Sequence, residues 1–229
     1  MSEPLIVNGV ALVADRFATL YWPERKTLIV SDLHLEKGSA FAVRGIMLPP
    51  FDSRETLARL QAAIEFRQPD RVICLGDSFH DQAGVERLDP GCRERLTTLM
   101  QGRDWVWITG NHDADRAAYL GGEAMEELRE SALTFRHEPL DGPAPGEVAG
   151  HLHPKARVMT KARSVSGPCF IADRQRLILP AFGAFTGGLD IGDAEFKRRF
   201  PKPHTLYLLA TERVWKIPST ALKKSSRRS

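Results

Sequence analysis

Four short apolar runs in the chain are each followed at once by polar residues of the kinds that bind metal ions. The runs are 27–30, 71–75, 105–108 and 147–149, and the polar residues after them are Asp32 and His34, Asp77, Asn111 and His112, and His151 and His153. Short apolar runs bounded by turns are typical of buried strands. Ligands bind at the carboxyl ends of the strands in open α/β sheets. The pattern therefore predicts an α/β fold in which four strand ends deliver these side chains to one place.

A helix is expected between the first two apolar runs. It would begin with Asp52 or Ser53 as its N-cap and end before Pro69. Its apolar residues recur at helical spacing, at Leu57, Leu60, Ala63 and Ile64. The order strand, helix, strand implies a parallel pair of strands joined by a crossover.

The spacing of apolar residues and the positions of proline predict further elements. Helices are expected over roughly 91–101 and 114–130, and a strand that ends in His137 over 133–137. Pro49 and Pro50 favour irregular structure over 37–50.

Both ends of the chain carry β-prone segments. Residues 5–22 predict a hairpin with turns at 8–9 and 15–16. Later β-prone segments are 157–160, 169–172, 176–179, 204–209 and 214–217. No linker is long enough to separate domains, so residues 1–220 are expected to form one domain with two sheets. The basic segment 221–229 is expected to be a disordered tail.

Composition indicates an ordinary globular protein, with 42% hydrophobic and 27% charged residues. The apolar runs are too short to span a bilayer, and no secretory signal is visible at the start. Three widely spaced cysteines argue against a disulfide framework or a thiolate zinc site. They fit a reducing compartment, so we expect a cytoplasmic location.

The net charge of +3 hides an asymmetry. Residues 1–150 hold 16 Lys and Arg against 24 Asp and Glu, a balance of −8, whereas residues 151–229 hold 16 against 5, a balance of +11. The basic second part could form a face for a polyanion. A solvated surface with a basic tail is the alternative interpretation.

The histidines concentrate in these motifs. Five of the seven are His34, His112, His137, His151 and His153. Neutral imidazole is the commonest metal ligand in proteins, and two ligands spaced two residues apart at a strand end can reach one ion. A glycine precedes Asp77 at its strand end, a position suited to a carboxylate that bridges two ions, while Asn111 offers an uncharged amide oxygen. The residues therefore predict a site for two divalent cations.

The motifs, in order, are Asp-x-His, Gly-Asp, Gly-Asn-His-Asp, a single His and Gly-His-x-His. Together, over about residues 27–153, they resemble those of the calcineurin-like metallophosphoesterase family. The resemblance implies a four-layer αββα sandwich with two mixed β-sheets flanked by helices. It also implies a first metal set of Asp32, His34, Asp77 and His153, and a second set of Asp77, Asn111, His137 and His151.

The same resemblance implies that His112 is a catalytic histidine that binds no metal and is oriented by Asp113. Two divalent ions about 3.5–4 Å apart lower the pKa of a bridging water and hold a phosphate ester. His112 would then protonate the leaving oxygen, a role typically worth about 10²–10⁴ in rate. A structural His–Asp hydrogen bond on a loop is the alternative.

Substrate contacts are expected from His80, Arg157 and Arg163. His80 follows Asp77 by three residues, and decoration of a loop is the alternative for it. The two arginines belong to a basic set expected to form a phosphate-contacting rim, together with Lys155, Lys161, Arg174 and Arg176.

Segments 75–80, 150–154, 168–170 and 179–188 resemble a narrower group, the bacterial ligase-associated DNA damage response endonucleases, or PdeM family. This resemblance implies a manganese-preferring phosphodiesterase or endonuclease that acts on DNA. It also implies functional association with an ATP-dependent DNA ligase, a helicase and an exonuclease. The ligand types alone also suit iron, zinc and other divalent ions.

Three functions follow as hypotheses. The two-metal site cleaves DNA, with the basic rim contacting phosphates; or it hydrolyses a small phosphodiester or nucleotide; or the chain is a non-catalytic scaffold of the same fold. Salt-sensitive DNA binding favours the first, and a KM for a small ester that does not depend on salt favours the second. A scaffold would have no need of His112 or of a complete ligand set.

Overall fold

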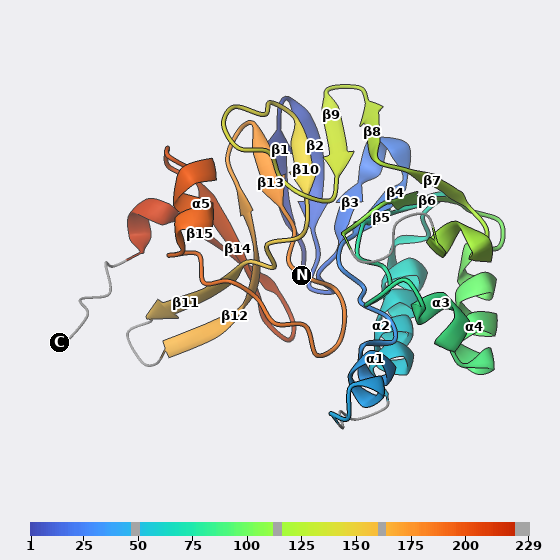
Figure 1. The fold of residues 1–229 in the computed structure, drawn as a ribbon. Coiled ribbons are helices and arrows are strands. Elements are labelled where there is room, and N and C mark those ends of the chain that lie inside the picture. Colours follow the sequence, from blue (N-terminus) through green and yellow to red (C-terminus); the bar gives the residue numbers. More distant parts are fainter. Residues whose placement is uncertain (47–50, 112–115, 160–163, 223–229) are drawn as a thin grey trace.

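A computed structural model describes residues 1–46, 51–111, 116–159 and 164–222 of the chain. Two mixed β-sheets form its centre (Figure 1). The first sheet is antiparallel from β1 to β4 and parallel from β4 to β7. Its strands, in spatial order, are β1 (Glu3–Val7), β2 (Val10–Ala14), β3 (Leu20–Trp22), β4 (Thr27–Val30), β5 (Arg71–Leu75), β6 (Asp104–Ile108) and β7 (Glu123–Met125).

The second sheet contains a parallel centre of β9, β10 and β13 between antiparallel strands. Strand β11 pairs with β12, and the two form a hairpin that extends from the sheet (Figure 1). In spatial order the strands are β15 (Val214–Pro218), β14 (Thr205–Leu209), β12 (Ser164–Ala172), β13 (Arg176–Ile178), β10 (Glu147–Ala149), β9 (Leu133–Arg136) and β8 (Glu127–Glu130), with β11 (Lys155–Met159) beside β12.

Within the described residues, three separate hydrophobic clusters define four layers. One cluster joins helices to the outer face of the first sheet, through Leu57, Leu60 and Leu96. A second, which includes Trp22 and Phe135, fills the space between the sheets. A third packs Phe196 against the outer face of the second sheet. This αββα sandwich confirms the fold class predicted from the sequence.

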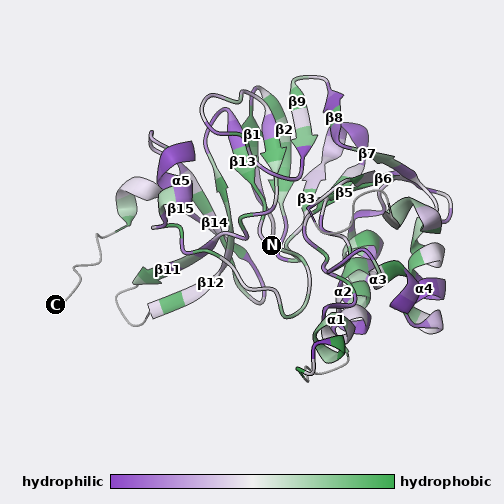
Figure 2. Cartoon of the chain, in the orientation of Figure 1, coloured by the Kyte–Doolittle hydropathy of each residue, from purple (hydrophilic) through white to green (hydrophobic). Residues whose placement is uncertain are grey.

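The helices cover both outer faces. The figure coloured by hydropathy shows apolar residues concentrated in the strands, and strongly hydrophilic stretches on α4 and α5 (Figure 2). The helices are α1 (Lys37–Val43), α2 (Asp52–Arg67), α3 (Gly84–Arg87), α4 (Pro90–Met100) and α5 (Ala194–Arg199), with short 3₁₀ turns η1 (Pro23–Arg25), η2 (Arg116–Leu120) and η3 (Ser219–Ala221). Within the described ranges, none of the helices has the length and apolar character needed to cross a bilayer.

The register of the strands brings the polar motifs to one edge. Strands β4, β5 and β6 run parallel, with Val30 beside Cys74 and Cys74 beside Trp107. In the facing sheet β10 runs parallel to β9 and β13. Since parallel strands end at the same edge of a sheet, the loops after β4, β5, β9 and β10 meet there.

Several expected elements agree with the structure, among them α2, α4 and the strands that precede the polar motifs. The helix expected over 114–130 is wrong for the residues that are described. There, Gly121 and Gly122 adopt φ values of +108° and +84°, which end the short turn η2. Of the acidic residues beyond them, Glu123 lies on β7 and Glu127 and Glu130 lie on β8, where Glu130 forms an ion pair with Arg71.

The expected irregular structure over 37–50 is also wrong in part, because residues 37–43 form helix α1. The caps expected for α2 are wrong as well. The Asp52 carboxylate accepts a hydrogen bond from the Gly38 amide, and the Ser53 hydroxyl donates to Glu36. Both side chains hold α1 against α2 rather than capping α2. Residues 47–50 and 223–229, which include Pro49, Pro50 and most of the expected tail, lie outside the described residues.

The basic rim expected from the sequence is wrong at two positions. Arg176 is 3% exposed, and its Nε lies 2.7 Å from Oε2 of Glu147, itself 1% exposed. Both residues begin their strands, so they lie at the edge opposite the loop after β10. Arg174, in the turn before β13, lies at that same distant edge. The pairing of Arg176 with the buried Glu147 could not be predicted from the sequence.

Replacing Arg176 by Met is expected to lower the free energy of unfolding by about 3–5 kcal/mol, because Glu147 would remain buried without its main partner. Denaturant unfolding measures this change. The matched control Arg198→Met removes an exposed arginine that pairs with Asp141, and it should change stability far less. Equal effects of the two substitutions would contradict the role given to Arg176, and adding Glu147→Leu to Arg176→Met should recover most of the loss.

Candidate metal centre

The loops after β4 and β10 together supply the first cluster of candidate ligands. One ligand atom each from Asp32, His34 and His153 lies within 4.8 Å of the other two. The Asp32 carboxylate is fully buried, and its Oδ1 lies 3.1 Å from Nε2 of His153. That contact lacks the geometry of a hydrogen bond, so within the described residues both atoms are buried without such a partner. A divalent cation suits these atoms, because it satisfies carboxylate oxygen and imidazole nitrogen together.

A second cluster lies beside the first and consists of Asp77, His137 and His151. Oδ2 of Asp77 lies 3.4 Å from Nε2 of His137 and 4.0 Å from Nε2 of His34. The same oxygen therefore stands between the two clusters, as a bridging carboxylate would. Each cluster draws residues from both sheets, since Asp32, His34 and Asp77 follow strands of the first sheet, and the other histidines follow strands of the second.

Hydrogen bonds orient two of these ligands. Nδ1 of His137 donates to the carbonyl oxygen of Leu75, at 2.9 Å, which leaves its Nε2 directed at Asp77. The backbone amide of His151 donates to Oδ2 of Asp32, at 3.0 Å, and the Ser31 hydroxyl donates to the same oxygen. The roles of Ser31 and of the Leu75 carbonyl could not be predicted from the sequence, because they depend on backbone positions.

The backbone of the motifs is unusual. Asp32, His34, Asp77, His151 and His153 all have positive φ, between +44° and +68°. This left-handed conformation is uncommon for residues other than glycine, and strained residues cluster at functional sites. The loops are fixed by main-chain hydrogen bonds between strand ends, from the His34 amide to the Asp77 carbonyl at 2.9 Å and from the Asp32 amide to the Gly76 carbonyl at 3.2 Å.

The glycines of the motifs are required by close packing. A Cβ at Gly76 would lie 2.4 Å from Nδ1 of His137, and one at Gly150 would lie 1.7 Å from the Ser31 hydroxyl. A Cβ at Gly110 would lie 2.2 Å from the backbone nitrogen and 2.3 Å from Oδ1 of Asp77. Glycine at each strand end therefore lets one loop approach the next closely enough for the ligands to meet.

The pKa values of the candidate ligands are shifted in different directions by burial and by neighbouring charges. Burial alone would raise the pKa of Asp32, but the His153, His137 and His34 rings outweigh it and lower that pKa. Burial opposes protonation of His137, yet its hydrogen bond to Asp77 and the charges of both aspartates raise its pKa to about 9. Burial lowers the pKa of His34 to about 4 and also lowers that of His151. The metal-free cluster thus holds a proton on His137 to offset its carboxylates.

The remaining candidates are dispersed. Asn111 is exposed and follows Gly110, which packs on Asp77. The His80 ring lies 5.6 Å from the His34 ring and 5.5 Å from the Phe41 ring, so it is beside the first cluster. Arg157 is exposed on β11, in the strand that begins two residues after His153. His112, Asp113, Lys161 and Arg163 lie outside the described residues.

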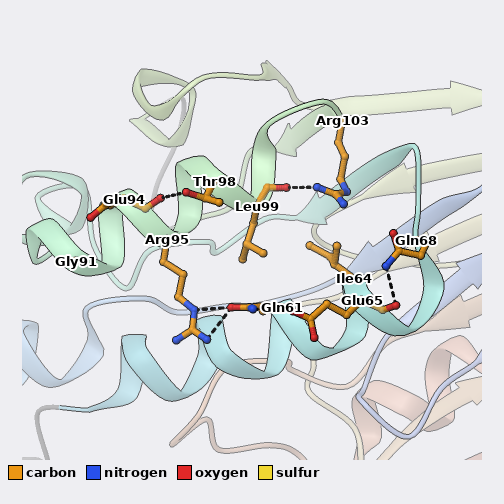
Figure 3. Close-up of a pocket in the computed structure, with 10 residues that line it drawn as sticks. All are labelled: Gln61, Ile64, Glu65, Gln68, Gly91, Glu94, Arg95, Thr98, Leu99 and Arg103. Carbon is orange, nitrogen blue, oxygen red and sulfur yellow. Dashed lines mark hydrogen bonds between the residues drawn. The ribbon is translucent and has the colours of Figure 1, made fainter.

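A groove elsewhere on the molecule is unrelated to these clusters. It lies between α2 and α4 and is lined by Gln61, Arg95 and Arg103 among others, with Arg95 bonded to the Gln61 amide oxygen (Figure 3). Both helices cover the outer face of the first sheet. None of the candidate ligands lines this groove.

Comparison with known proteins agrees with this geometry. Residues 25–177 match the model of the calcineurin-like phosphoesterase family, and the chain belongs to that family. Its structure is similar to that of the nuclease MPE from Pseudomonas putida, with a TM-score of 0.70 and 28% identity over 95% of this chain and all of that one. The phosphoesterase Yfce from E. coli is more distant, with a TM-score of 0.42 and 15% identity over 80% of this chain and 92% of the other. No curated protein matches the chain.

The protein is therefore a metal-dependent phosphoesterase, with two candidate metal-binding clusters at the strand-end edge of the sandwich. Divalent cations at such clusters activate water and stabilise charge on a phosphate ester. The chain's own contribution is a set of oriented imidazoles and buried carboxylates. The resemblance stated from sequence motifs alone is confirmed at the level of the family.

Cation binding is expected to strengthen as pH rises from 6 to 8, by about tenfold per pH unit for one displaced proton. A ligand must be deprotonated, and His137, with a pKa raised to about 9, holds its proton across this range. His34, with a pKa lowered to about 4, is already deprotonated across this range and does not contribute to the pH dependence. Calorimetric titration of Mn²⁺ in two buffers of different protonation enthalpy should detect the released proton. Affinity that does not change with pH, or a His137→Gln variant with the same slope, would contradict this assignment.

Substituting Gly110 by Ala is expected to weaken Mn²⁺ binding by about 10–100-fold, as loss of groups that orient ligands does. The new methyl group would displace Asp77. The matched control is Gly187→Ala, because a Cβ at Gly187 meets nothing within 4 Å. Equal affinity in the two variants, measured by the same titration, would show that the close approach at Gly110 is not needed.

Proposed function

We propose that this phosphoesterase is a nuclease that hydrolyses phosphodiester bonds of DNA. The observation that carries the proposal is the pair of adjacent clusters with Asp77 between them. The full-length similarity to a protein described as a nuclease supports a nucleic acid as the substrate class, and the choice of DNA rests on the family resemblance stated from the sequence. The balance of +11 over residues 151–229 supports a polyanionic substrate.

The proposed ligand sets are those of the family. Asp32, His34, Asp77 and His153 would hold one cation, and Asp77, Asn111, His137 and His151 the other. When bound, the cations would supply an activated water and charge stabilisation at the phosphate. In this proposal His112 donates a proton to the leaving oxygen, and Asp113 orients its ring.

The proposed path of the substrate passes the basic hairpin. Lys155 and Arg157 lie on β11, which begins two residues after His153, and Arg163 falls between β11 and β12 in the sequence. His80 lies beside His34 and is a further candidate contact. Arg174 and Arg176 are excluded from this set by their position at the opposite edge.

Three finer points belong to the proposal. Manganese is the proposed ion, although the ligand types also accept iron or zinc. Residues 1–220 are proposed to act as a single domain. Functional association with an ATP-dependent DNA ligase, a helicase and an exonuclease in DNA repair in the cytoplasm is proposed on the family resemblance alone.

The test is hydrolysis by purified protein with added Mn²⁺, on single-stranded, double-stranded and nicked DNA and on an aryl phosphodiester. DNA cleavage with a steep loss of binding as salt rises is expected, because phosphate contacts release counterions. Asp77→Ala should abolish activity, and His112→Ala should lower the rate by about 10²–10⁴. His204→Ala is the matched control, since His204 lies beside β14 at the distant edge.

The outcomes separate the candidate functions. Hydrolysis of the aryl ester without cleavage of any DNA would favour a small diester as substrate. Activity that survives Asp77→Ala would rule out the proposed ligand sets. A well-folded, Mn²⁺-loaded protein without any hydrolysis would favour a non-catalytic scaffold.

A further inference from the structure

A small pocket lies directly beside the first cluster of candidate ligands. Its volume is about 280 Å³, close to the lower end of ordinary ligand sites at about 300–1,000 Å³. Helix α2 forms one wall, and the loop around residues 181–187 forms another. His153 of the metal cluster is part of its lining, together with Glu55, Arg59 and Lys155. The pocket is therefore contiguous with the candidate metal centre.

Arg59 projects from α2 into this pocket. Its guanidinium lies 4.9 Å from the centre of the Phe182 ring, which is fully buried. Burial lowers the pKa of Arg59, and the charge of Glu55 opposes that effect. No hydrogen bond or ion pair from the described residues satisfies the guanidinium. A partly buried arginine without such a partner is costly to maintain, and an anion in the pocket would offset that cost.

Lys155 provides a second positive charge from the other side of the pocket. Its backbone is fixed by hydrogen bonds to Leu189 and Ile191. Its side-chain stem passes over Gly188, where an added Cβ would lie 3.0 Å from Cγ of Lys155. Glu55 is the acid in the lining, and it is exposed on α2. Two cations against one exposed acid favour an anionic ligand.

The pocket is rigidly connected to the metal cluster. The Phe182 amide donates to the Ser31 carbonyl at 2.8 Å, and the Gly183 amide donates to the Asp32 carbonyl at 3.0 Å. On its other side, the Ala184 amide donates to the Thr56 hydroxyl of α2 at 2.9 Å. The loop thus spans from the candidate ligand Asp32 to the helix that carries Arg59, so the distance between the pocket and the metal cluster is fixed.

We propose that this pocket binds the phosphate that neighbours the scissile phosphodiester in a nucleic-acid strand, with Arg59 as a specificity-determining residue and Lys155 as its partner. The planar guanidinium presents a fork of donors that matches phosphate oxygens, and the aromatic ring beneath it fixes the plane of the fork. This inference rests on the proposed nuclease function and deepens it. It predicts that the protein favours a diester within a polynucleotide over an isolated diester.

Dinucleotides with a single internal diester provide the test. TpT is compared with pTpT and TpTp, which add one terminal phosphate on either side, and cleavage of the internal bond is followed by chromatography with Mn²⁺. Wild-type protein should cleave one of the two phosphorylated forms with a kcat/KM about 10–100-fold above that of TpT, as a charge-assisted contact allows. Arg59→Gln should remove most of this preference.

The matched control is Arg54→Gln, which removes the same charge from the same helix. Arg54 is exposed and pairs with Asp89, away from the pocket. It should keep the wild-type preference. A wild-type protein without any preference, or equal preferences in the Arg59 and Arg54 variants, would overturn the proposal while leaving the nuclease function intact.

Two further measurements decide the remaining cases. If Arg59→Gln lacks a cooperative melting transition, Lys155→Gln replaces it, and an unchanged preference in that variant overturns the proposal. If wild-type protein cleaves none of the dinucleotides, the nuclease function is still decided by the DNA substrates above, and binding of a fluorescent thymidine oligonucleotide decides the role of the pocket. Loss of one phosphate contact should then lower the slope of log affinity against log salt by about 0.7 in Arg59→Gln but not in Arg54→Gln. Equal slopes would overturn the proposal.

Discussion

Two carboxylates buried at the ends of neighbouring parallel strands impose the main constraint on this structure. Asp32 and Asp77 are 0% and 3% exposed, and withdrawing a carboxylate from water costs several kcal/mol unless positive charge or hydrogen bonds compensate. The surrounding residues supply that compensation. Imidazoles from the facing sheet approach both acids, His137 retains a proton, and the His151 amide and the Ser31 hydroxyl donate to Asp32. The left-handed backbone and the closely packed glycines serve this arrangement, because without them the loops could not come so near to one another.

Much of the fold could be predicted from the sequence, because strands buried on both faces leave a continuous apolar signal. The runs before Asp32, Asp77 and His151 correspond to β4, β5 and β10. Elements decided by long-range contacts could not be predicted. The acidic segment 123–130 has the composition of a helix, yet it forms two short strands in which Glu130 pairs with Arg71 and Glu127 with Arg136. From the sequence, Arg176 was likewise expected to be a surface cation, whereas the structure places it beside the buried Glu147.

In the candidate site, too, some residues could be predicted from local sequence and others depend on long-range contacts. The polar residues after the apolar runs predicted that these side chains meet at one edge, and the fold brings five of them, together with His137, into two clusters. The two ligand sets came from the family resemblance, and the role of their members as ligands stays a prediction. Arg59 gave no signal, because a single arginine within an amphipathic helix is ordinary. Its relation to Phe182, more than a hundred residues later, arises only when the loop after β13 packs on Asp32 and α2. Residues that bind through local motifs are visible in a sequence, whereas those that act through tertiary packing are not.

Each candidate cluster takes its members from both sheets, and this has a consequence for the turnover of the protein in a cell. Cations bound there would cross-link the two halves of the sandwich through its open edge. A chain newly made under metal starvation would rely on hydrophobic contact between the sheets to keep that edge closed, and the loops there would open more often. Proteases act on such transiently opened segments. The abundance of the protein would then follow the supply of the ion, even without any dedicated regulator.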